Sequence, residues 1–174
     1  MDPRTDYFSI FDLPAGFNID KALLKTRYLS LQKEFHPDRV AGQSAQQQRL
    51  ALQSAALVNQ AFSVLSSSVQ RAGYLLERAG LDTTTEQTHT NIEFLSAQME
   101  LRERLAEIEQ TERPLQALSE LEAQVVEECR VLEEEFATTY AKGELESARA
   151  VLDKIQFFDK LRIEIEQLEE SLED

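Results

Sequence analysis

The sequence predicts an all-α protein, with an N-terminal antiparallel helical hairpin flanked by short helices and a C-terminal three-helix antiparallel bundle. Three observations lead to this fold class. Only 5 Gly and 4 Pro occur in 174 residues, while Leu, Ala, Glu, Gln and Arg, which favour helices, are abundant. Apolar residues recur at helical spacing along several long segments. No two candidate strands are joined by residues typical of a turn.

The N-terminal half is expected to begin with a short apolar helix over residues 6–13. Either Asn18 or Asp20 can cap the next helix. Its apolar stripe consists of Leu24, Tyr28, Leu31 and Phe35, and its other faces carry Lys21, Lys25, Arg27 and Lys33. Because the residue before a proline avoids the helical region, Pro37 predicts that this basic helix stops at or near His36.

A long second helix completes the predicted hairpin. Ser44 and Gln47 form a capping-box pattern at its start. Its expected apolar face is rich in small residues and consists of Leu50, Ala51, Ser54, Ala55, Val58, Ala61, Phe62 and Leu65. A further short helix is predicted over residues 69–79, with Gly80 ending it. Residues 81–90 are interpreted as a linker.

Three helices are predicted in the C-terminal half, at about residues 91–110, 114–141 and 144–172. Thr90 and Glu93 form a second capping-box pattern, Pro114 suits a first helical turn, and Gly143 breaks the chain. Along the second helix, apolar residues recur every three or four positions and form a coiled-coil-like seam of Leu118, Leu121, Val125, Cys129, Leu132, Phe136 and Tyr140. Short connections between the three imply an antiparallel bundle.

Charge divides the chain into two parts. The net charge is −14, and residues 1–75 hold 8 Lys and Arg against 6 Asp and Glu, whereas residues 76–174 hold 10 against 26. A split of this size predicts two units with different partners. The excess of negative charge argues against nucleic acid and an anionic membrane as main partners.

Hydrophobic content, targeting signals and cysteine count exclude several classes of protein. A hydrophobic share of 42% allows a buried core. No segment approaches the ~20 apolar residues of a membrane-spanning helix. The N-terminus has the features of neither a signal peptide nor a transit peptide. The single cysteine, Cys129, excludes an internal disulfide and a thiol-rich zinc site. We therefore expect a cytoplasmic protein with no metal and no cofactor.

No catalytic site is apparent, so we do not expect an enzyme. His36 and Asp38 share one connection between helices, but the sequence places no nucleophile or second carboxylate beside them. We find no glycine-rich phosphate-binding loop and no helical pair of metal-binding histidines. His89 is interpreted as a solvated linker residue, and Cys129 as a buried structural thiol.

The tripeptide His36-Pro37-Asp38 takes its meaning from the helices around it. A basic helix precedes it, and a small-residue helix that ends in residues 58–65 follows it. This arrangement resembles the J domain of DnaJ-type co-chaperones over about residues 5–75. The resemblance implies that His36, Pro37 and Asp38 dock on a DnaK-type chaperone and stimulate its ATPase. It also implies electrostatic contacts from Lys25, Arg27 and Lys33.

One departure from the J-domain pattern concerns Leu29 and Ser30, which stand where two consecutive basic residues are typical. The basic surface is therefore arranged differently, which suggests a dedicated chaperone partner. No Gly/Phe-rich stretch and no cysteine-rich zinc module follows the J-like segment. A general co-chaperone for unfolded clients is thus disfavoured.

Further motifs narrow the family. Residues 71–76, 94–95, 100–103 and 158–162 resemble HscB, the J-type co-chaperone family of iron–sulfur cluster assembly, and the resemblance covers essentially the whole chain. It implies an HscA-like DnaK-type chaperone and an IscU-like cluster scaffold as partners, in the bacterial cytoplasm. It also implies an L-shaped molecule with a J domain (1–80), a linker (81–90) and a scaffold-binding bundle (91–174). The implied scaffold-binding residues are Leu95, Met99, Glu100, Glu103, Glu107 and Phe157.

A helical wheel tests independently whether the first bundle helix has a binding face. With Phe94 at zero, the core stripe of Leu101, Leu105 and Ile108 lies within about 40°. An opposite face, at roughly 140° to 240°, carries Ile92, Ser96, Met99, Glu100, Glu103 and Glu107. It is either an ordinary solvated acidic face or an apolar spot rimmed by carboxylates. Ser96 stands where an apolar contact is expected. On the last helix, Phe158 follows the core seam, so Phe157 is expected at its edge.

Three functions follow, in decreasing order of support. The first is a co-chaperone that stimulates a dedicated ATPase and delivers the scaffold to it, assisting cluster assembly and transfer. The second is a helical adaptor whose J-like half is only structural, or a J-domain co-chaperone with a different client. The third is an enzyme whose site is drawn from both halves, which the charge split disfavours.

Overall fold

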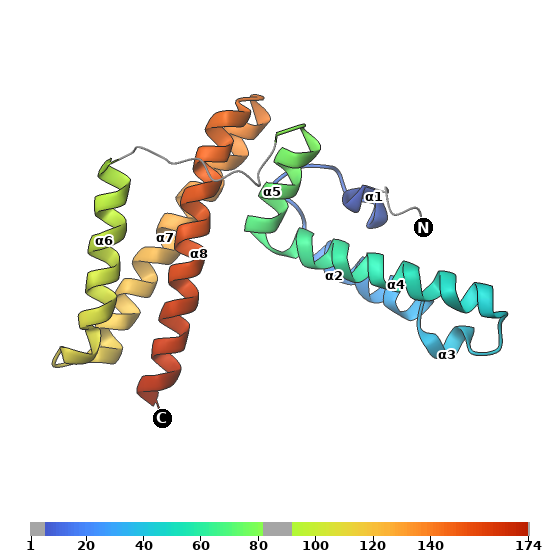
Figure 1. Ribbon diagram of the computed structural model, residues 1–174, viewed down its shortest axis with the longest axis horizontal. Helices are drawn as coiled ribbons and strands as arrows, with labels where there is room; N and C mark the ends of the chain where they lie inside the picture. Colours follow the sequence, from blue (N-terminus) through green and yellow to red (C-terminus); the bar gives the residue numbers. More distant parts are fainter. Residues whose placement is uncertain (1–5, 82–91, 174) are drawn as a thin grey trace. The chain divides into compact units, whose positions relative to one another are not determined.

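The structure is a computed structural model that describes residues 6–81 and 92–173. Every regular element in these ranges is helical, which confirms the all-α prediction (Figure 1). The chain forms two compact units, Met1–Leu75 and Leu76–Asp174. The L-shaped arrangement and the boundaries of the predicted domains stay predictions. Thr90 of the predicted Thr90–Glu93 capping box and His89 lie outside the described ranges.

The first unit opens with a single helical turn, α1 (Tyr7–Ile10), capped by the side chain of Asp6. It is shorter than the helix predicted over residues 6–13. The chain turns after it, because Asp12 adopts a left-handed backbone with φ of 49° and the Leu13 amide donates to the Phe8 carbonyl at 2.9 Å. The turn buries Phe8, Phe11 and Leu13, so hydrophobic burial rather than helix propensity decides this segment.

The hairpin consists of α2 (Lys21–Glu34) and α4 (Ala45–Ser66). Asp20, not Asn18, caps α2, since its Oδ1 accepts from the Leu23 amide at 2.9 Å. The predicted Ser44–Gln47 capping box is present. The two helices pack through Tyr28 and Phe62, whose stacked rings have centroids 3.9 Å apart. Leu50 was expected on the buried face of α4 but is 52% exposed.

Helix α5 (Ser68–Arg78) begins in the first unit, and its residues up to Leu75 close the core of that unit. Arg71 is buried and its Nε donates to the Phe17 carbonyl at 2.7 Å, with the guanidinium 4.9 Å from the Phe17 ring centroid. The Tyr74 ring stacks on Tyr7, with centroids 4.5 Å apart. Gly80 ends the helix as predicted, with φ of 89°, a conformation that glycine adopts without steric cost.

The second unit contains α6 (Ile92–Glu107), the short 3-10 turn η1 (Ile108–Gln110), α7 (Pro114–Ala141) and α8 (Leu145–Glu173). Helices α7 and α8 pack along one another, and α6 lies against them (Figure 1). The seam between α7 and α8 buries Leu118, Leu121, Val125, Leu132, Phe136, Leu152, Ile155, Phe158, Leu161 and Ile165. Cys129 and Tyr140 lie at its margin, half-buried.

Candidate functional site

The His-Pro-Asp tripeptide does not form a plain loop. It begins α3 (Pro37–Val40), a single helical turn in which His36 is the N-cap and Pro37 the first helical residue. Proline suits this position, because its fixed φ matches the helix and its missing N–H would lack an intrahelical partner. Helix α2 ends at Glu34, so the predicted stop near His36 is confirmed. We call residues 36–38 the tip.

The side chains of His36 and Asp38 lie together at the tip. The Asp38 amide donates to His36 Nδ1 at 3.3 Å, and the Asp38 Oδ2 lies 3.6 Å from the same nitrogen. His36 Nδ1 thus accepts from the Asp38 amide and has the Asp38 carboxylate close beside it. The Asp38 side chain is 91% exposed and can reach a cation on a partner.

The basic face of α2 is only partly available to a partner. Lys25 and Lys33 are exposed, as predicted. Arg27, however, is half-buried: its Nη1 donates to the carbonyls of Phe11 and Asp12 and lies 3.1 Å from the Asp12 carboxylate. Its guanidinium therefore ties α2 to the turn after α1, which revises the expectation that Arg27 is a surface contact like the two lysines.

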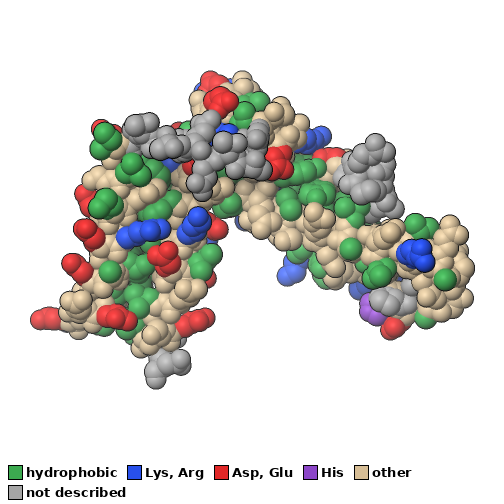
Figure 2. Space-filling model, in the orientation of Figure 1, with side chains coloured by type: hydrophobic (Ala, Val, Ile, Leu, Met, Phe, Trp, Pro, Cys, Tyr) green, Lys and Arg blue, Asp and Glu red, His purple; other side chains and the backbone are tan. Residues whose placement is uncertain are grey.

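The outward face of α6 combines apolar and acidic side chains, as the helical wheel predicts. Ile92, Leu95 and Met99 are 76%, 49% and 64% exposed, whereas the core stripe at Leu101 and Leu105 is buried. The remaining exposed members of this face are Ser96, Glu100, Glu103 and Glu107. Figure 2 shows apolar and acidic side chains side by side along this helix. We call Leu95, Met99, Glu100, Glu103 and Glu107 the α6 face.

Phe157 is not at the edge of the bundle, contrary to expectation. It is 8% exposed and its neighbour Phe158 is 6% exposed. Both are covered because Phe94 of α6 lies across them, with ring centroids 5.8 Å and 6.4 Å away. The guanidinium of Arg102 also lies 5.7 Å from the Phe157 ring centroid. Phe157 therefore supports the α6 face from beneath, through Phe94 and Arg102.

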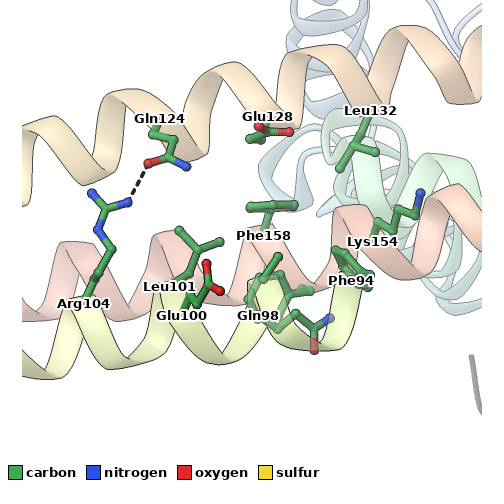
Figure 3. Close-up of a pocket in the computed structure, with 12 residues that line it drawn as sticks. Phe94, Gln98, Glu100, Leu101, Arg104, Gln124, Glu128, Leu132, Lys154 and Phe158 are labelled. Atoms are coloured by element: carbon green, nitrogen blue, oxygen red, sulfur yellow. Dashed lines mark hydrogen bonds between the residues drawn. The ribbon is translucent and has the colours of Figure 1, made fainter. Parts of the chain in front are cut away.

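A cavity of about 290 Å³ lies between α6, α7 and α8. Its floor is apolar, with Leu101, Leu132 and Phe158, and Figure 3 shows these side chains between the helices. At one end Arg104 Nη1 donates to Gln124 Oε1 at 2.8 Å, joining α6 to α7. The sequence did not predict this cavity. Its walls come from three helices, and a helical wheel describes only one helix at a time.

Within the described ranges, no group of three or more His, Cys, Asp or Glu side chains is placed to hold a metal ion. Of the helices in the same ranges, none is both long enough and apolar enough to cross a membrane. The Cys129 thiol is half-buried, and burial raises its pKa.

The chain is similar to known proteins over nearly its whole length. Residues 90–166 match the model of the HSCB C-terminal oligomerisation domain. The co-chaperone protein HscB homolog of Mannheimia succiniciproducens is 37% identical over 169 residues, covering 96% of this chain and 97% of that protein. The corresponding protein of Photobacterium profundum is 38% identical, covering 97% and 99%. The chain belongs to the HscB family.

Solved structures of HscB proteins agree with this membership. Chaperone HscB from Vibrio cholerae matches with a TM-score of 0.89 and 33% identity, covering 97% of this chain and 99% of that one. The human co-chaperone HscB matches with a TM-score of 0.86 and 30% identity, covering 96% and 83%. The yeast co-chaperone Jac1, at 18% identity and a TM-score of 0.70, shares the fold. This HscB-family chain thus carries the tip in its first unit and the α6 face in its second.

Proposed function

We propose that this HscB-family protein is a J-domain co-chaperone of iron–sulfur cluster assembly. It stimulates the ATPase of a dedicated, HscA-like DnaK-type chaperone and delivers an IscU-like scaffold protein to it, in the bacterial cytoplasm. The observation that carries the proposal is the exposed Asp38 carboxylate, held beside His36 on a one-turn helix, in a chain similar to HscB proteins over nearly its full length.

The tip has the physical properties of a docking element. An exposed carboxylate forms a charge-assisted hydrogen bond with a partner arginine or lysine, which is stronger than a bond between neutral groups. His36 Nδ1 accepts from the Asp38 amide, and proline has a fixed backbone φ, so less conformational entropy is lost on binding. Lys25 and Lys33 add positive charge that attracts an acidic partner surface and raises the association rate.

The α6 face has the properties of a client-binding surface. Leu95 and Met99 expose apolar area to water, which favours its burial against a partner. Glu100, Glu103 and Glu107 line one side of this area and suit a client whose apolar patch has basic residues at its rim. Phe157 contributes by supporting α6, and the exposed Ser96 leaves a polar spot within the surface.

Carrying both surfaces on one chain gives the co-chaperone its effect. A scaffold held on the second unit is brought to a high local concentration near the chaperone held on the first, so delivery does not depend on a chance encounter. The chemistry of ATP hydrolysis belongs to the chaperone. Neither surface needs a catalytic group of this chain.

A steady-state ATPase assay with an HscA-like chaperone tests the proposal. We expect stimulation by this protein alone and a larger stimulation when the IscU-like scaffold is added, because the scaffold occupies the chaperone as its client. A helical adaptor with a purely structural J-like half would stimulate no DnaK-type ATPase. If the ATPase rate were stimulated equally with and without the scaffold, the result would favour a co-chaperone with another client.

A further inference from the structure

Ile92 is the first residue of α6 and lies next to the α6 face. Its side chain is 76% exposed, more than those of Leu95 and Met99. A single exposed isoleucine needs no explanation, because much of any protein surface is apolar. What Ile92 does therefore depends on whether it is isolated or continues a larger apolar surface.

The spacing along α6 joins Ile92 to its two apolar neighbours. Ile92, Leu95 and Met99 stand at i, i+3 and i+7, which places them on one side of the helix. With Phe94 at zero, they lie at about 160°, 100° and 140° around the helix axis. At a rise of about 1.5 Å per residue, Ile92 and Met99 are roughly 10 Å apart along that axis. We call these three residues the apolar strip.

The apolar strip is unusual within the described residues. No other helix in residues 6–81 and 92–173 brings three exposed large apolar side chains within two turns. On α7, Leu115 and Val126 are about three turns apart, and on α8 Ile163 stands alone among the described residues. Exposed apolar area that is gathered in one place indicates an interaction site, whereas the same area scattered singly does not.

Charge is distributed unevenly along the same side of α6. The apolar strip occupies the N-terminal half of the helix, and three exposed acids follow it toward the C-terminal end: Glu100, Glu103 and Glu107. Glu93, the acid of the first turn, lies about 100° around the helix from Ile92. A partner that complements both parts is apolar where it meets Ile92 and basic where it meets Glu107.

We infer that Ile92 is a contact for the IscU-like scaffold, and that the apolar patch of the scaffold lies on the apolar strip with its basic rim toward Glu107. The inference rests on the proposed function and deepens it, because it adds a specificity-determining residue and gives the scaffold a direction along α6. Ile92 precedes Ser96 by one helical turn. It thus supplies apolar area beside the position where Ser96 is polar and exposed.

The contact is tested by Ile92→Ala, with Ile163→Ala as the matched control. Ile163 is also an exposed isoleucine of the second unit, at 49%, but it lies on α8. Neither side chain is part of the core, and circular dichroism checks that both variants keep the fold. Isothermal titration calorimetry with the IscU-like scaffold should show binding about fivefold to tenfold weaker for Ile92→Ala and unchanged for Ile163→Ala.

The outcomes separate this inference from the proposed function. Wild-type affinity in Ile92→Ala, or an equal loss in Ile163→Ala, would overturn the contact while scaffold binding by the wild-type protein still stands. Failure of the wild-type protein to bind the scaffold would reject the proposed function itself.

Two charge variants test the direction of the scaffold. Ile92→Glu places a carboxylate where the scaffold is apolar, so it should weaken binding at least as much as Ile92→Ala. Glu107→Gln removes a carboxylate that faces the basic rim, so it should reduce the dependence of the affinity on salt concentration. Tighter binding by Ile92→Glu, or an unchanged salt dependence in Glu107→Gln, would overturn the direction.

Discussion

The rings of Phe94 and Phe157 form a T-shaped pair, with an interplanar angle of 83° and ring centroids 5.8 Å apart. Edge-to-face aromatic pairs are stabilising beyond the area they bury. This pair joins α6 to α8 directly beneath the α6 face. The position of Leu95 and Met99 therefore depends on a contact on the other side of α6.

Phe157→Ala should lower the free energy of unfolding of the second unit by about 3–5 kcal/mol, because it removes a buried ring and leaves a cavity under α6. Chemical denaturation followed by far-UV circular dichroism measures the loss. Phe157→Leu, which keeps most of the volume, should lose much less and retain scaffold affinity. If Phe157→Leu were as stable as wild type but failed to bind the scaffold, the ring would be a direct contact and the supporting role would be wrong.

Replacing Leu95 and Met99 together with alanine should weaken scaffold binding at least about tenfold, since the two carry the exposed apolar area of the α6 face. Isothermal titration calorimetry measures the affinity. Thermal stability should stay close to that of wild type, because both side chains are largely exposed. Leu115→Ala is the matched control: Leu115 is 49% exposed, like Leu95, but lies on α7. An equal loss of scaffold affinity in Leu115→Ala and in the double variant would mean that the effect is not specific to the α6 face.

His36→Gln should abolish ATPase stimulation and leave scaffold binding intact. A glutamine can hydrogen-bond, but its flexible side chain does not reproduce the fixed imidazole nitrogen that accepts from the Asp38 amide at 3.3 Å. The two activities are read in separate assays on the same preparation, with circular dichroism to confirm the fold. Parallel loss of both activities in a folded variant would argue against the division of roles between the tip and the α6 face.

Features set within one helical turn were predictable from the sequence. The Ser44–Gln47 box depends on two residues three positions apart, and the helix stop before Pro37 depends on adjacent residues; both are present. Features set by another element were not. Phe157 is buried because Phe94 lies over it, and the Arg27 guanidinium is bound to Asp12 in the turn after α1. The spacing of residues along one helix contains neither partner, so Phe157 was expected at the edge of the core and Arg27 on the basic surface of its helix.

The same distinction explains Leu50, which the sequence placed on the expected apolar face of α4. Leu50 lies in the first two turns of α4, and its partner α2 ends at Glu34. Leu50 is therefore 52% exposed. Hydrophobicity and spacing predict which face of a helix packs, but they do not say where along the helix the partner ends.

Asp20→Ala should destabilise α2 by about 1 kcal/mol, because the Asp20 carboxylate accepts from the Leu23 amide at 2.9 Å at the helix N-terminus. Asn18→Ala, at the alternative cap position, should have little effect. Amide hydrogen exchange reports local opening, and a loss of this size corresponds to roughly fivefold faster exchange in the first turn of α2. Faster exchange in the Asn18 variant and none in the Asp20 variant would show that the wrong cap had been assigned.

Cys129 should react with thiol reagents more slowly in the folded protein than in the unfolded chain. Burial raises its pKa above the ordinary value, with nearby carboxylates acting in the same direction and the positive charge of Arg162 opposing them. A raised pKa means that less thiolate, the reactive form, is present at any pH below it, so the rate should climb as pH increases. Because the chain has one cysteine, the release of thionitrobenzoate from Ellman's reagent reports this site alone. A folded-state rate equal to that in urea would show that the margin of the α7–α8 seam opens freely to solvent.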